Sequence, residues 1–444
     1  MNHLRKTLLL AVLAFPFSIV WGQTVSDKND TLSLSLTQVW QKAEQNSRSI
    51  TINKEAVNIS QEEIKDAQSE RLPELGVSGS IEKATNIPIY VNGLFTHPEQ
   101  HEVIHTLYRL GTDLDLNIYN GGKLNLKIQQ DKTLHQLSII EKDKTVSDIH
   151  LAAAALYLEL QRSLIFRDLM TNDIADQEKQ LLQIRAFLKN GVVLKSDVLR
   201  AELSLSKRKM TLVQIQNDIL IANQKLNIII GEPDDRVVHP DPLADPKNNA
   251  LASYDEVLAE ALQHSFPYHI SEQKTKLSEI QLKQVRANVR PKVTLYGDFY
   301  YANPQIFLYP YNPYWYSLGI GGLRASFPLS SLYHNVHKER AARMELMKEE
   351  ETHKDVEDKV RQQVKEAYLR FKEALLQIDV AQVNVAQAEE NARIIKNSYF
   401  NQAALITDLL DADVQVLQAR FDLAASKITA QNKYYLLQNI IGTL

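Results

Sequence analysis

Two long stretches of the chain contain neither glycine nor proline, and they constrain its fold more than any other feature. They cover residues 123–190 and 329–441 of a chain of 444 residues. Because glycine and proline are the strongest breakers of regular structure, their absence predicts long uninterrupted helices. A helix over residues 123–188 would be about 100 Å long at about 1.5 Å per residue, far longer than a compact domain is wide. Such a rod must pack along its side against other helices.

The two stretches differ in their packing seams. In the second stretch the apolar positions are spaced alternately by four and three residues, a heptad repeat that predicts left-handed supercoiling against neighbouring helices. This seam comprises Val360, Val364, Ala367, Phe371, Ala374, Ile378, Ala381, Val385, Ala388, Ala392, Ile395 and Tyr399. In the first stretch Ser163, Arg167 and Gln177 interrupt the seam, so we expect looser packing there. Its apolar members are Ile149, Ala153, Leu156, Leu160, Ile174, Leu181, Ile184 and Leu188.

The sequence also repeats itself. Residues 34–81 align without a gap on residues 252–299, and further along the chain Tyr157 aligns with Tyr368. An internal duplication of this length predicts two similar structural units in one chain.

Each expected unit runs helix, strand pair, long helix and closing helix. The first unit covers residues 34–231, the second covers 253–442, and a connector rich in Pro and Asp joins them at 232–252. Within the units we expect strand pairs at 74–120 and 292–328, long helices at 123–189 and 331–400, and closing helices at 196–230 and 408–441.

The expected strands alternate between apolar and polar residues, as half-buried strands do. Leu114, Leu116 and Ile118 alternate with Asp113, Asp115 and Asn117. Aromatic residues cluster around Pro310 and Pro313 in the second strand pair. Four such strands fit a membrane β-barrel with an apolar lipid face and a polar lumen face, where Asp113 and Asp115 would lie; the alternative is a small soluble sheet with a tyrosine-rich rim. Because four strands cannot close a barrel alone, membrane insertion would require oligomerisation.

Residues 1–22 have the pattern of a secretory signal peptide. Arg5 and Lys6 precede an apolar run that ends at about Trp21, so cleavage is expected near Gly22 or Gln23. The mature chain is then exported, and no other candidate transmembrane helix remains in it.

Composition excludes several classes of protein. The chain has 50 Lys and Arg against 54 Asp and Glu, and this net charge of -4 provides no basic field for a nucleic-acid partner. It has no cysteine, which excludes disulfide frameworks, thiolate metal sites, iron–sulfur clusters and an acylated N-terminal cysteine.

No motif indicates catalysis or a cofactor. The chain has no glycine-rich phosphate loop, nucleophile elbow or HExxH motif, so we expect neither an enzyme nor a cofactor. His97, His101 and His105 have the spacing that would align three metal ligands on a helix. Pro98 and their place in the loop between the first two strands favour a solvated loop instead, so no metal site is predicted.

Together these features resemble the TolC-like outer-membrane efflux proteins. The resemblance covers nearly the whole mature chain, from the opening pattern at 34–46 and its echo at 253–264 to the closing residues 436–442. Its most specific pieces are two helix-hairpin turns, at 191–201 and 402–412. It implies a mixed α/β membrane protein: a homotrimer in which each chain gives four strands to a twelve-stranded outer-membrane β-barrel in contact with lipid. Below this barrel, the long helices would form a periplasmic α-helical barrel.

The resemblance implies the exit duct of a tripartite efflux or type I secretion system. A periplasmic membrane-fusion adaptor would engage this passive channel and link it to an inner-membrane transporter of the RND, ABC or MFS type. The implied adaptor-docking residues are Gly191, Val192, Leu194, Lys195, Ser196 and Asp197 in the first turn, and Ala403, Ala404, Leu405 and Ile406 in the second. A periplasmic coiled-coil spacer and an outer-membrane enzyme are the alternatives, and a spacer has no use for two strand pairs. The cargo and the pump class stay open.

The resemblance also implies a periplasmic aperture lined by Asp408 and Asp411, with Tyr399 beside them. The two aspartates lie at i and i+3 and so share a helix face. In a trimer they would form two stacked rings of three carboxylates, a charge filter for cations.

A structural role competes with this interpretation. Asp197 and Asp408 fall in the expected first turns of helices, where Ser196 and Thr407 would cap and a carboxylate favours the helix dipole. For Asp197 we favour capping, and for Asp411, which lies past the cap, we favour the pore.

Two positions depart from the family pattern. Gln402 replaces the glycine usual at the second turn, and Ala404 stands where the best-known members carry a basic gate residue, although Tyr399 is kept. We therefore expect packing, rather than the family's ionic links, to hold the aperture closed.

Overall fold

The computed structural model describes residues 31–248, 252–306 and 311–444. The expected signal peptide, 1–22, lies outside the described residues. Along the chain the elements are β1 (Leu32–Leu34), α1 (Leu36–Asn46), α2 (Arg48–Ser69), β2 (Glu74–Lys83), β3 (Ile87–Ile89), β4 (Glu99–His101), β5 (Thr106–Asn120), α3 (Lys123–Lys189), α4 (Lys195–Ile230), β6 (Val238–Pro240), η1 (Pro246–Asn248), α5 (Tyr254–His264), α6 (Phe266–Arg286), η2 (Ala287–Val289), β7 (Lys292–Asn303), β8 (Tyr316–Ser326), α7 (Ser331–Phe400) and α8 (Ile406–Ile441).

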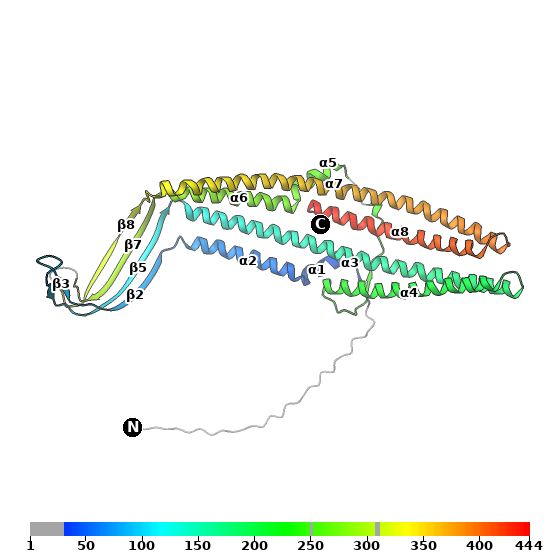
Figure 1. Cartoon of the computed structure of the whole chain (residues 1–444), viewed down its shortest axis with the longest axis horizontal. Coiled ribbons are helices and arrows are strands. Elements are labelled where there is room, and N and C mark those ends of the chain that lie inside the picture. The colour runs from blue at the N-terminus through cyan, green and yellow to red at the C-terminus, as the bar shows by residue number, and fades with distance from the viewer. Residues whose placement is uncertain (1–30, 249–251, 307–310) are drawn as a thin grey trace, which may run out of the picture.

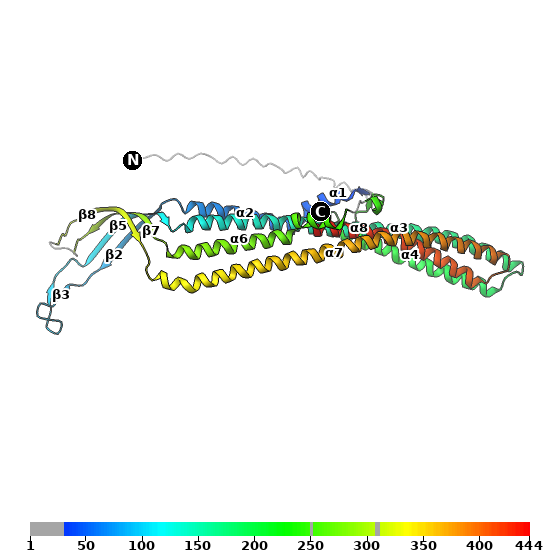
Figure 2. The ribbon, with the colours of Figure 1, turned by 90° about the horizontal axis from the view of Figure 1, so that it is seen from above.

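The elements form a long rod with a sheet at one end and two helix turns at the other (Figure 1). Helices α3 and α7, of 67 and 70 residues, run from the sheet to the turns. Helices α2 and α6 accompany them along the half nearer the sheet, and α4 and α8 along the other half, as Figure 2 also shows. The C-terminus lies near the middle of the rod. None of the helices in the described part of the chain is both long and apolar enough to cross a membrane.

The same local signals begin and end matching helices in the two halves. Helices α1 and α5 each start with a capping box, made by Ser35 with Gln38 and by Ser253 with Glu256. Helices α4 and α8, each of 36 residues, both end in a glycine with positive φ, Gly231 (77°) and Gly442 (93°). In each half, therefore, a serine caps the first helix and a glycine ends the last one.

The main sheet has four antiparallel strands in the order β2-β5-β7-β8, so β2 and β8 are its edges. Directly opposite residues of neighbouring strands share a face. One face carries Leu75, Val77, Ile81, Leu110, Phe299 and Leu323, all exposed in the single chain. The other carries Glu74, Ser78, Arg109, Asp113, Asp115 and Asp298. Strand β8 departs from this division, because Leu318 and Ile320 lie on the polar face.

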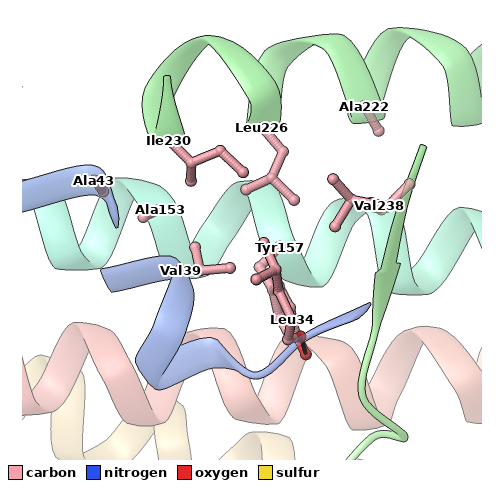
Figure 3. Close-up of a cluster of buried hydrophobic side chains, with 10 residues drawn as sticks. Leu34, Val39, Ala43, Ala153, Tyr157, Ala222, Leu226, Ile230 and Val238 are labelled. Carbon is pink, nitrogen blue, oxygen red and sulfur yellow. Dashed lines mark hydrogen bonds between the residues drawn. The ribbon is translucent and has the colours of Figure 1, made fainter. Parts of the chain in front are cut away.

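A cluster in the middle of the rod joins the first half together (Figure 3). Side chains from α1, α3 and α4 meet there, and Leu34 of β1 and Val238 of β6 close it. Tyr157 crosses the cluster, donates its hydroxyl to the Leu34 carbonyl oxygen at 3.0 Å and accepts from the Asp241 backbone N–H at 2.8 Å. The parallel pairing of β1 with β6 brings residues 238–240 of the expected connector to this core.

Buried residues follow the seam of α7 closely. Its members from Val360 to Ala381 are all buried, and they pack against α5 and α8. The seam of α3 corrects one expectation: Ser163 and Gln177 are buried members of the seam rather than interruptions of it. Ser163 can be buried because its hydroxyl donates to the Glu159 carbonyl oxygen one turn earlier, at 3.0 Å.

Candidate functional site

The two turns implied as docking sites lie side by side at the end of the rod opposite the sheet (Figures 1 and 2). One apolar cluster joins their four helices: Leu181 and Ile184 of α3, Val198 and Ala201 of α4, Tyr399 of α7, and Ile406 and Leu409 of α8. The cluster explains why the turns are adjacent although about 200 residues separate them in sequence. The expected docking and aperture residues therefore share one end of the molecule, whereas Asp113 and Asp115 lie in the sheet at the other.

The two turns have nearly the same backbone. The N–H of Val192 donates to Phe187 O at 2.9 Å, and the N–H of Ala403 donates to Ser398 O at 2.8 Å. These six-to-one bonds end α3 and α7 in Schellman motifs, which require a left-handed residue just past the helix. That residue is Gly191 in the first turn and Gln402 in the second.

The starts of α4 and α8 also match, and they correct the expected caps. Ser196 and Thr407 lie inside the helices, because α4 begins at Lys195 and α8 at Ile406. The aspartates do the capping instead. Asp197 Oδ2 accepts from the Leu194 N–H at 3.3 Å and Asp408 Oδ2 from the Leu405 N–H at 3.2 Å.

Each turn presents an exposed leucine. Leu194 is 70% exposed and Leu405 is 69% exposed, and Val192 is also exposed. The helices begin directly after these leucines, so their side chains project from the turns instead of packing into the cluster. The two turns therefore expose a leucine at the same place relative to the helix that follows.

The expected aperture residues divide into an exposed pair and a buried one. Asp408 and Asp411 are exposed on α8, while Leu409 and Ala412 between and beside them are buried. Asp408 serves the cap, and Asp411 makes no hydrogen bond or ion pair with the described residues.

Tyr399 lies in the apolar cluster, only 5% exposed in the single chain. Its hydroxyl has no hydrogen-bond partner among the described residues. Burial, followed by the nearby charge of Asp197, raises the pKa of Tyr399.

A buried polar layer, which sequence reasoning missed, lies beside this cluster on the side away from the turns. Gln177 and Gln180 of α3 both donate their side-chain Nε2 to Asp413 Oδ2 of α8, at 2.9 and 2.8 Å. Both glutamines are less than 10% exposed. The layer binds α8 to α3. Polar residues at seam positions of α3 are the sequence signal that could have revealed it.

An ion pair completes the layer between α3 and α4. Arg208 Nε donates to Asp173 Oδ2 at 2.6 Å, with 6% and 13% of the two side chains exposed. Burial of the carboxyl, together with the charges of Asp413 and Asp176, raises the pKa of Asp173 despite the attraction of Arg208. The pair fixes α4 against α3 as Asp413 fixes α8.

At the other end, the polar face of the sheet gathers acidic side chains. Asp113 pairs with Asp298 of β7 and with Gly76 of β2, where an added Cβ would come within 2.5 Å of Asp113 Oδ2. Arg109 Nη2 lies 3.1 Å from Asp298 Oδ2 and offsets part of this charge. Asp115 lies further along β5 on the same face.

The three histidines of the first strand loop do not come together as ligands. His105 Nε2 lies 2.8 Å from Asn86 Oδ1, and the His101 ring packs on Tyr311 with ring centroids 4.5 Å apart. Within the described ranges, no group of three or more His, Cys, Asp or Glu side chains could hold a metal ion.

Two segments of the chain, residues 39–232 and 257–443, match the family model described as outer membrane efflux protein. These segments cover most of both halves, including both turns and all four strands of the main sheet. The chain belongs to the outer membrane efflux protein family. No curated protein sequence matches it.

Solved structures share the fold of this outer membrane efflux protein at low sequence identity. VceC from Vibrio cholerae is 17% identical, with a TM-score of 0.72, and the match covers 92% of this chain and 96% of that one. The CmeC channel of Campylobacter jejuni is 14% identical, with a TM-score of 0.71 and coverage of 99% and 94%. The MtrE channel of Neisseria gonorrhoeae is 15% identical, with a TM-score of 0.72 and coverage of 92% and 89%.

Proposed function

We propose that this outer membrane efflux protein is one protomer of a homotrimeric exit duct that crosses the outer membrane and extends into the periplasm. The observation that carries the proposal is the four-stranded sheet, which exposes apolar side chains on one face and carries charged ones on the other. An apolar face suits lipid, and a polar face suits a water-filled lumen. Leu75 and Val77 would then face lipid, and Asp113 and Asp115 the lumen.

The open edges of the sheet support the trimer. Strands β2 and β8 each have one side without a partner in the described chain, and an open edge is not tolerated in lipid. Three copies joined edge to edge would close a barrel of twelve strands. Exposed apolar residues also line α4 and α7, including Leu203, Leu220, Leu376 and Val380, and would pack between protomers in a helical barrel. The matching order and length of the elements in the two halves support an internal duplication of the unit.

The turns supply the periplasmic end of the proposed duct. Asp408 and Asp411 of three protomers would ring the aperture, with Tyr399 behind them. Since Ala404 offers no charge, the closed state would depend on the apolar cluster at the turns and on the bonds of Asp413 to α3.

The exposed Leu194 and Leu405 would dock the tips of a periplasmic adaptor, which links the duct to an inner-membrane transporter of the RND, ABC or MFS type. The N-terminal signal of residues 1–22 would direct export of the chain. The duct would act passively, without catalysis or a cofactor.

Light scattering and crosslinking test these two parts separately. The purified mature chain in detergent should scatter as a trimer, and a monodisperse monomer would contradict the barrel. A photo-crosslinker placed at position 194 or 405 in the native host should couple the chain to one adaptor protein. Leu194→Asp and Leu405→Asp should weaken that coupling while trimer yield stays normal, because each puts a charge into an apolar contact. Normal coupling in both variants would remove the turns from the docking surface.

A further inference from the structure

Gln402 is the one non-glycine residue with a positive φ in the described part of the chain, at 63°. This left-handed conformation is unfavourable for a residue with a side chain, because Cβ approaches a neighbouring carbonyl oxygen. In the first turn the equivalent position is Gly191, with a φ of 73°. The second turn thus uses the less stable residue for the same backbone.

The turn itself gives no reason for a glutamine. The hydrogen bonds that close the two turns have the same pattern, and their lengths differ by only about 0.1 Å. The Gln402 side chain is exposed, and it makes no hydrogen bond with the described residues. A Cβ built on Gly191 meets nothing within 4 Å, so this corner of the turn is open to solvent. No hydrogen bond of the Gln402 side chain to the described residues therefore compensates for this strain.

The surroundings of Gln402 indicate what its amide could contact. The first turn is flanked by the charged Lys189 and Lys195, but residues 397–407 around the second turn carry no charge. Gln402 lies three residues before Leu405, the exposed apolar residue of that turn. A primary amide offers both donors and an acceptor, and so it matches a peptide group of another chain.

We infer that Gln402 is a specificity-determining residue of the second turn, where its side-chain amide hydrogen-bonds a backbone peptide group at the tip of the docked adaptor. The inference rests on the proposed function and deepens it. Leu405 supplies the apolar part of the contact, and the amide selects a partner whose tip exposes a free peptide N–H and C=O. The first turn, with Gly191 and two lysines, makes a different contact, so the two turns are not interchangeable.

The test compares stability and adaptor binding in the same variants of the trimer. Gln402→Gly removes the strain and the amide together, so its melting temperature should rise by about 1 to 3 °C. Its affinity for the adaptor identified by crosslinking should fall by about 3- to 10-fold, the effect of one lost hydrogen bond. Gln402→Asn keeps an amide on a residue that tolerates the left-handed region better, and should retain more affinity than the glycine variant.

Gly93→Gln is the control, because it puts the same side chain on a left-handed glycine, with φ of 103°, in the loop between β3 and β4, away from both turns. A Cβ at Gly93 meets nothing within 4 Å. The melting temperature of this variant should fall, with little change in adaptor affinity. If Gln402→Gly melts higher and binds the adaptor as tightly as the wild type, the inference is wrong while the proposed duct stands. If the wild-type trimer itself binds no adaptor, the docking part of the proposed function is wrong and the inference falls with it.

Discussion

Asp413 accepts a hydrogen bond from the side-chain amide of Gln180 over 2.8 Å, although the two residues belong to opposite halves of the chain. Gln177 donates to the same carboxylate oxygen. A partly buried carboxylate is thus satisfied by two neutral amides rather than by a cation. On α8, Asp413 follows Asp411 by two positions, so the two side chains lie on different faces of the helix. One face carries the exposed Asp411, and the other carries Asp413, which bonds to α3.

Replacing Asp413 should loosen the two halves from each other. Asp413→Ala leaves two buried amides without an acceptor, so we expect a loss of about 2 to 4 kcal/mol in the free energy of unfolding. Denaturant unfolding of the purified protein would measure it. Asp422→Ala is the control, because Asp422 is exposed on the same helix and its carboxylate accepts from Gln418 Nε2, at 2.8 Å. It should change stability by less than about 0.5 kcal/mol. Equal losses in the two variants would mean that the buried hydrogen bonds of Asp413 contribute no more to stability than the exposed one of Asp422.

The glycines that end α4 and α8 should differ in their tolerance of alanine. A Cβ at Gly442 would lie 2.2 Å from the His264 carbonyl oxygen, which belongs to the backbone and cannot easily move. At Gly231 the nearest atom, 2.6 Å away, belongs to the Asn46 side chain, which can rotate. We expect Gly442→Ala to cost about 2 to 4 kcal/mol, and Gly231→Ala about 1 to 2 kcal/mol. Thermal unfolding of the two variants would test the order, and a larger loss at Gly231 would contradict it.

Tyr157 should make part of the stability sensitive to alkaline pH. Burial raises the pKa of Tyr157 from 10.0 to about 12. The folded chain therefore keeps this proton between pH 10 and 12, while the unfolded chain loses it. The stabilisation by this group is complete below pH 10 and is lost as pH rises through the folded value.

Tyr157→Phe removes both the titration and two hydrogen bonds. At pH 7 the variant should be about 1 to 2 kcal/mol less stable than the wild type. That difference should shrink between pH 10 and 12, as denaturant unfolding at several pH values would show. A difference that stays constant over this range would argue against the raised pKa.

The aspartates of α8 should govern ion selectivity if they ring the proposed aperture. In planar bilayers, the double variant Asp408→Asn, Asp411→Asn should lose cation preference and any block by divalent cations added from the periplasmic side. The pair Asp113→Asn, Asp115→Asn changes the same number of charges in the wider strand region and should alter the reversal potential less. If Asp408 and Asp411 can both be neutralised without a change in reversal potential, their role is confined to the helix.

Much of the helical framework could be read from local sequence. The absence of glycine and proline predicts helices as long as α3 and α7, and the even seam of Val360 to Ala381 is buried as a heptad pattern requires. These features depend on neighbours within a few residues, which a sequence displays directly. The family resemblance of the two turns points to Leu194 and Leu405 as docking residues; both are exposed, and their docking role stays a prediction.

Features that depend on distant partners could not be predicted in this way. Gln177 looks like a break in the seam of α3 until Asp413, 236 residues further on, comes into contact with it. Strands β1 and β6 have three residues each, too few for a detectable alternation, and they are defined only by pairing with each other. Hydroxyl residues usually cap, so the sequence points to Ser196 and Thr407 as the caps of α4 and α8, with an aspartate in each first turn. The helices begin one residue before each hydroxyl residue, and the aspartates at the third helical position accept the backbone hydrogen bonds instead.

The unpaired edges of β2 and β8 have a genetic consequence. In the proposed trimer every chain must join two others through these edges. A trimer that contains one chain with a damaged edge therefore cannot close its barrel. When normal and damaged chains are made in equal amounts, roughly one trimer in eight contains only normal chains. A variant such as Leu323→Pro, which damages the β8 edge but leaves β2 intact, would therefore act dominantly over the wild-type allele rather than as a silent loss of one copy.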